Sequence, residues 1–178
     1  MVWSDTFETA TGWTVNPNAT DTATTGAWER ANPADTTSSG AKQLGTTVSG
    51  SFDLVTGGAA GTGAGDFDVD GGTTSIRSAA IALPASGTLT LSLAWYLAHG
   101  SNASSADFFR VSIVHSGGTT AVFTRTGAAA DLDAVWAVAS ASLNPYAGQS
   151  VRILIEAADA SGASLVEAAV DDVTITQS

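Results

Sequence analysis

Ten residues decide the fold class of this chain: TLTLSLAWYL, at positions 88–97. Every second position from Leu89 to Leu97 carries leucine or tryptophan, and the positions between them carry threonine, serine, alanine and tyrosine. Alternation of this kind predicts a β-strand that buries one face. Trp95 lies on the leucine side, which predicts that it packs in the core. Tyr96 lies on the opposite side.

Shorter segments repeat this pattern along the chain. Phe109, Val111 and Ile113 alternate with residues that would face away from the core. Turn-forming clusters separate such segments by about 8–12 residues, a spacing typical of a β-sandwich or jelly roll. No segment has the periodicity of an amphipathic helix, so we predict one all-β domain, an antiparallel β-sandwich, over residues 1–178. Further strands are expected at residues 75–83, 121–124, 135–138, 151–155 and 170–176.

The charge balance limits the kinds of partner. The 178 residues include 17 Asp and Glu but 6 Lys and Arg, which gives a net charge of −11. This excess of acid argues against a protein that binds nucleic acid or docks on an anionic membrane. The chain has no cysteine and therefore no disulfide or thiolate metal site. A secreted protein of this composition needs another source of stability, such as bound calcium.

One acidic loop has the spacing of a calcium-binding turn. Asp66, Asp68 and Asp70 alternate and are followed by Gly71, in the order D-x-D-x-D-G. Alternate carboxylates before a glycine allow a loop to curl around a hard cation. An EF-hand would place a glutamate at the twelfth position, where this chain has an arginine, so the loop is not an EF-hand. We predict Asp66, Asp68 and Asp70 as calcium ligands, with the carbonyl of Gly72 as a further one.

A second acidic cluster lies near the C-terminus, at Asp171 and Asp172. In a regular strand Asp171 would point to the core side, where an unpaired carboxylate costs several kcal/mol. Two solutions remain open. Either a cation binds at the edge of the sandwich, with Asp171 and Asp172 as ligands, or a β-bulge turns Asp171 outward.

No residue pattern indicates catalysis. The chain has two histidines, His99 and His115, each at the end of a predicted strand. It has neither a zinc-binding H-E-x-x-H motif nor a G-x-S-x-G nucleophile motif. We therefore predict no catalytic residue. A hydrolase that uses a pair of aspartates is the least favoured alternative.

Two aromatic residues are candidates for ligand binding. Exposed aromatic rings stack on sugars and anchor protein contacts. Tyr96 lies on the face opposite the leucines. Trp28 lies in a long loop-rich region over residues 14–72, where it is either a loop anchor or a binding residue. We predict Trp28 and Tyr96 as ligand-binding residues.

Four segments together resemble a known group of domains. Asp5-Thr6-Phe7-Glu8 with Gly12-Trp13 is similar to the opening of MAM-like and galactose-binding-like jelly rolls. The other three segments span residues 26–33, 67–78 and 164–173. The combination resembles accessory C-terminal domains of secreted bacterial hydrolases, notably actinobacterial zinc carboxypeptidases and other peptidases.

The resemblance implies a two-sheet jelly roll that is secreted, binds Ca²⁺ and carries out no chemistry itself. Carried over by position, Glu8 and Asp171 would hold the structural calcium. The expected partners are a polysaccharide or another surface polymer, and the catalytic domain of the parent enzyme in the same chain. The alternative is a structural or protein-interaction domain that stabilises or targets its parent peptidase without a sugar site.

Overall fold

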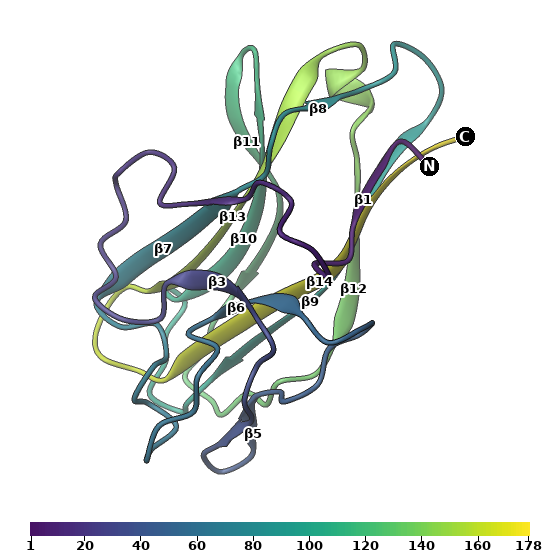
Figure 1. Cartoon of the computed structure of the whole chain (residues 1–178). Helices are drawn as coiled ribbons and strands as arrows, with labels where there is room; N and C mark the ends of the chain where they lie inside the picture. Colours follow the sequence, from purple (N-terminus) through teal and green to yellow (C-terminus); the bar gives the residue numbers. More distant parts are fainter.

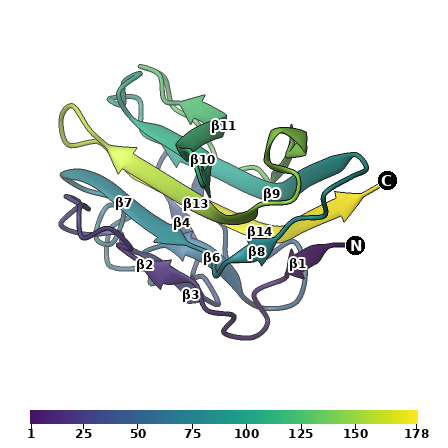
Figure 2. The same ribbon diagram turned by 90° about the horizontal axis from the view of Figure 1, so that it is seen from above.

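Two antiparallel sheets pack face to face in a computed structural model that describes residues 1–178 (Figures 1 and 2). Sheet A has the strand order β12-β9-β14-β6-β3, and β1 pairs with β14. Its strands are β1 (Trp3–Asp5), β3 (Trp28–Ala31), β6 (Asp53–Thr56), β9 (Leu89–His99), β12 (Ala137–Ser142) and β14 (Val166–Gln177).

Sheet B has the strand order β11-β10-β13-β7-β2, and β8 pairs with β13. Its strands are β2 (Thr14–Val15), β7 (Gly72–Arg77), β8 (Ile81–Ala82), β10 (Phe108–His115), β11 (Gly118–Thr126) and β13 (Ser150–Asp159). A small hairpin of β4 (Thr36–Thr37) and β5 (Ala41–Gln43) lies outside both sheets, and the one helix is a 3-10 turn at Asn144–Tyr146. The predicted all-β sandwich is confirmed. No helix of the structure is long and apolar enough to cross a membrane.

The alternating segment at 88–97 forms most of β9, and its leucine face is the core. Leu89, Leu91 and Leu93 are each at most 2 % exposed and belong to a cluster of 26 buried residues between the sheets. Trp95 is partly buried against this cluster, where its ring stacks on Phe109 with 5.3 Å between centroids. Burial of this apolar face is the main source of stability of the sandwich.

A β-bulge in β14 resolves the problem that Asp171 posed. The register against β9 shifts between Asp171 and Thr174, and Asp172 has a φ of +49°. Val170 faces the core before the bulge and Val173 faces it after the bulge, so the inward parity changes from even to odd positions. The bulge turns Asp171 to the outer face of sheet A, as the second of the two alternatives predicted.

The loop-rich region at residues 14–72 supplies β2 to β6 and also covers part of sheet A. The anchor of this cover is Lys42, which is fully buried and lies 2.9 Å from Asp131 and 2.8 Å from Asp133. Burial acts to lower the pKa of Lys42, but the hydrogen bonds to Asp133 and Asp131 outweigh it and the pKa is raised. The ammonium group therefore stays charged and ties the loop-rich region to the segment that carries Asp131 and Asp133.

Candidate functional site

The outer face of sheet A is closed to ligands where Tyr96 lies. Tyr96 points away from the core as predicted, but it is 1 % exposed. Its hydroxyl accepts a hydrogen bond from the N–H of Leu44 at 3.4 Å. Its ring packs against that of Trp136 in a T-shaped arrangement, with 4.9 Å between the ring centroids. The prediction of Tyr96 as a ligand-binding residue is wrong, because a second layer of chain covers the face on which it lies.

Trp28 is also buried and is not available to a ligand. It opens β3, is 1 % exposed and packs against Phe109 with 6.4 Å between ring centroids. Its indole N–H has no hydrogen-bond partner, so its contribution is apolar packing. The prediction that Trp28 binds a ligand is therefore also wrong.

The outer face of sheet B carries a row of long polar side chains. Core residues of β13 such as Ile153 and Ile155 alternate with Arg152, Leu154 and Glu156, which face outward. Residues that pair directly in a sheet lie on the same face. Glu156 pairs with Arg110 of β10 on one side and Ser75 of β7 on the other, and Leu154 pairs with Ser112 and Arg77.

The arginines of this face are held in place and keep free donors. The Nε of Arg110 donates to Glu156 at 2.9 Å, and its guanidinium lies 4.4 Å from the centre of the Phe108 ring. Arg77 donates one N–H to Asn18 at 3.2 Å, and Arg152 donates one to the carbonyl of Ser78 at 3.1 Å. A guanidinium has five N–H donors, so each arginine retains most of its hydrogen-bonding capacity for a ligand.

The sequence reasoning did not single out these arginines, although a signal was present. Arg110 and Arg152 each occupy an outward position within an alternating apolar run. Charged residues there are normally read as solvated surface, and only the pairing of β10, β13 and β7 shows that they share one face.

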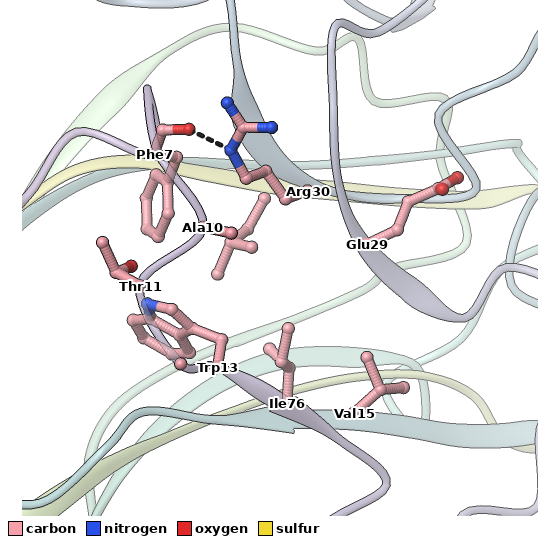
Figure 3. Close-up of a pocket in the computed structure, with 10 residues that line it drawn as sticks. Phe7, Ala10, Thr11, Trp13, Val15, Glu29, Arg30 and Ile76 are labelled. Carbon is pink, nitrogen blue, oxygen red and sulfur yellow. Dashed lines mark hydrogen bonds between the residues drawn. The ribbon is translucent and has the colours of Figure 1, made fainter.

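A second candidate is a notch between the edges of the two sheets (Figure 3). It encloses about 130 Å³, with Trp13 and Ile76 on one side and Phe7 and Arg30 on the other. Arg30 donates to the carbonyls of Phe7 and Glu8, and Glu29 accepts from the N–H of Gly58 at 2.7 Å. These polar groups fix loops, so the notch offers mainly apolar contact.

The predicted calcium ligands at the two ends of the chain meet around one turn. Glu8 accepts from the N–H groups of Ser51 and Phe52, each at 2.9 Å, and these bonds lower its pKa. Asp171 accepts from the N–H groups of Val48 and Ser49 at 2.8 and 3.0 Å.

Asp172 completes this group by accepting a hydrogen bond from the hydroxyl of Ser49 at 2.6 Å. The carbonyls of Phe7 and Glu8 are in turn taken by Arg30. The oxygens of Glu8, Asp171 and Asp172 that make these bonds are directed at N–H and O–H donors. In this geometry they do not fit a cation, and they act instead as clamps on residues 47–52.

The predicted calcium loop is split by the fold. Asp66 is exposed and accepts from the N–H groups of Thr62 and Gly63, which closes a local turn and lowers its pKa. Asp68 is 2 % exposed, and its Oδ2 accepts from the N–H of Val166 at 3.0 Å, while its Oδ1 has no partner. Gly72 is the first residue of β7 and pairs with Asp159 of β13.

Asp68 and Asp70 fit a cation better than the group of Glu8, Asp171 and Asp172 does. Burial raises the pKa of Asp68 to about 7, and the negative charges of Asp70 and Asp159 add to that rise. Asp68, Asp70 and Asn102 line an open pocket of about 190 Å³. No group of three or more histidine, aspartate or glutamate side chains gathers in a geometry that could hold a metal ion. Any ion here would need backbone and water oxygens as well.

Asp53 of β6 is a buried acid that the sequence did not single out. It is fully buried, and neither of its carboxylate oxygens has a hydrogen-bond partner. Burial raises its pKa to about 8, and the negative charge of Asp171 adds to that rise. No alternation pattern surrounds Asp53 in the sequence, because β6 is four residues long and buried throughout.

Comparison with known proteins finds similarity at the level of structure. No protein-family model matches the chain, and no curated protein matches it. The adhesin domain K1 of Lys-gingipain from Porphyromonas gingivalis superposes with a TM-score of 0.56 at 14% identity, over 99% of this chain and 98% of that one.

Two carbohydrate-binding modules superpose on this chain with comparable TM-scores. The C-terminal family 22 module of Clostridium thermocellum Xyn10B has a TM-score of 0.53 at 14% identity, over 98% of this chain and 92% of that one. TmCBM61, solved in complex with β-1,4-galactotriose, has a TM-score of 0.51 at 12% identity, over 93% and 88% of the two chains. The chain has the β-sandwich fold of these modules. At these identities the likeness describes the fold, and the side chains of this chain must carry any argument about a ligand.

Proposed function

We propose that this domain is a non-catalytic carbohydrate-binding module that binds a polysaccharide on the outer face of sheet B. The observation that carries the proposal is the contrast between the two outer faces. The face of sheet A is covered around Tyr96, while the face of sheet B presents three partly exposed arginines with unused donors. The fold shared with carbohydrate-binding modules supports the proposal.

The side chains of this face suit a sugar chain. The three arginines of this face are partly exposed and offer its polar contacts, whereas Leu154 and Ser112 are only 6 % and 2 % exposed. Arg110 is fixed by Glu156 and Phe108 before a ligand arrives, so little conformational entropy is lost on binding.

The proposal predicts that Arg110→Ala weakens polysaccharide binding without unfolding the protein. Affinity electrophoresis against a panel of soluble plant and bacterial polysaccharides identifies a bound polymer, and titration calorimetry then measures the association constant. Loss of hydrogen bonds from a charged donor lowers that constant about tenfold or more.

Arg125→Ala is the matched control for this prediction. Arg125 is on β11 of the same sheet, but it pairs with the core-facing Phe109 and therefore lies on the other face from Arg110. Equal loss of binding in both variants, or no binding to any polymer, would contradict the proposal. The structural or protein-interaction alternative would be favoured by two results together: no binding to any glycan, and loss of stability of the parent enzyme when the domain is deleted.

Calcium binding is part of the same proposal, with Asp68 and Asp70 as the side-chain ligands. The unpartnered Oδ1 of Asp68 and its pocket support this placement. Calcium takes six to eight oxygen ligands, which include carbonyls and water. An ion there would neutralise the repulsion between Asp68, Asp70 and Asp159.

Removal of calcium is expected to lower the midpoint of thermal unfolding at pH 8, because the repulsion between these carboxylates returns. The measurement compares melting in CaCl₂ with melting in EDTA. Asp68→Asn is expected to abolish the difference, while Asp66→Asn keeps it, since Asp66 only closes its own turn. The same midpoint in CaCl₂ and in EDTA would refute the calcium proposal.

The biological setting is also proposed and rests on the resemblance of the four sequence segments. We infer a secreted bacterial hydrolase, such as a peptidase, whose catalytic domain lies in the same chain. In that setting the module would hold the enzyme near an extracellular polymer.

A further inference from the structure

The outer face of sheet B differs in charge from the rest of the molecule. Three of the 6 basic residues, Arg77, Arg110 and Arg152, lie on this face. Of the 17 acidic residues, Glu156 faces the same way and is paired with Arg110. Asp21 reaches the edge of the face, and its two oxygens accept from the N–H and hydroxyl of Ser75 at 2.7 and 2.5 Å.

The other basic residues do not contribute to this patch. Lys42 is buried and paired with two aspartates, and Arg30 is bound to the carbonyls of Phe7 and Glu8. Arg125 lies on the opposite side of β11. Half of the basic residues of this acidic protein therefore lie on one sheet face, where Glu156 pairs with Arg110 while Arg77 and Arg152 have no carboxylate partner.

The register places the three arginines at different positions along a sugar chain. Arg77 pairs with Leu154, two residues from Arg152, which puts their Cα atoms about 8 Å apart. Arg110 pairs with Glu156, so its Cα lies about 12 Å from that of Arg77 and about 14 Å from that of Arg152. An extended oligosaccharide can reach all three.

We infer that the polysaccharide bound by this face carries carboxylate groups, as in a sugar chain substituted with uronic acids. The guanidinium fork matches a carboxylate with two parallel hydrogen bonds, and neutral hydroxyls use this geometry less well. This inference rests on the proposed function, since it names the class of polysaccharide.

The charge of the whole protein limits the density of these carboxylates. A net charge of −11 repels a continuous polyanion such as a nucleic acid. Isolated carboxylates on an otherwise neutral backbone meet the arginines without that repulsion.

The test uses one polymer in two chemical forms. Titration calorimetry compares glucuronoxylan and gum arabic with the same polymers after reduction of their uronic acids to neutral sugars. The association constant for the native form is expected to fall about tenfold on reduction, and about tenfold in Arg77→Gln and in Arg152→Gln. Arg125→Gln is the matched control and is expected to bind like the unmodified protein.

Each other result has a separate meaning. Equal binding of the native and reduced polymers overturns the inference and leaves the proposed function standing. Binding to neither polymer nor to any other glycan overturns the proposed function and the inference with it. Equally tight binding of polyglutamate or of single-stranded RNA shows a general anion site and also overturns the inference.

Discussion

Asp53→Asn is expected to raise the midpoint of thermal unfolding at pH 8 and to change it little at pH 4. Asp53 is fully buried, its two oxygens have no partner, and burial raises its pKa to about 8. In the unfolded chain the same group has its ordinary pKa of 3.8. Asparagine has a similar shape and carries no charge at any pH.

The sign of the pH dependence follows from these two pKa values. Below pH 3.8 the group is protonated in both states and the folded state keeps its full stability. Between pH 3.8 and about 8 unfolding releases a proton from Asp53, so the free energy of unfolding falls as the pH rises. The loss is complete above about pH 8 and reaches several kcal/mol. The protein should therefore be most stable in mild acid.

Urea unfolding of both proteins in EDTA between pH 4 and pH 9 measures this effect. The free energy of unfolding of Asp53→Asn is expected to depend less on pH than that of the parent. Asp66→Asn is the matched control, because the pKa of Asp66 is lowered and its stabilising effect is lost toward acid pH. Lower stability of Asp53→Asn at pH 8 would show that the carboxylate is charged and held by a protein partner.

The alternation of apolar residues was sufficient to predict the fold. Leucine or tryptophan at every second position of 88–97, and the similar runs at 109–113 and 151–155, specify strands that bury one face. A chain with several such strands and short turns has few ways to bury those faces other than a sandwich. The alternation of inward and outward positions also left two possible environments for Asp171, a cation site or a β-bulge, and the structure has the bulge.

The functional face could not be predicted in the same way. Parity placed Tyr96 outside the core correctly, but parity within one strand does not show that residues 41–48 return to cover it. The partners of Asp171 lie more than 120 residues away in the chain, at Val48 and Ser49. The arginine face likewise depends on the pairing of β10, β13 and β7, which is a long-range property.

Trp28→Ala is expected to destabilise the protein by about 3–5 kcal/mol, the range for removal of a large buried aromatic side chain. The indole is 1 % exposed, contacts Phe109 and lies in the main core cluster. Its truncation leaves a cavity between the sheets that the neighbouring strands can only partly fill. Urea unfolding followed by circular dichroism measures the loss.

Trp28→Phe separates a packing role from a binding role. Phenylalanine keeps an apolar ring and removes an N–H that has no partner, so its cost should be well below that of alanine. Because Trp28 is buried, the folded Trp28→Phe protein is expected to bind any polysaccharide as the parent does. A Trp28→Ala protein that kept its stability but lost binding would instead return Trp28 to the role that the sequence suggested. That result would mean that the opening of β3 is accessible to sugar and that the outer face of sheet B is not the site.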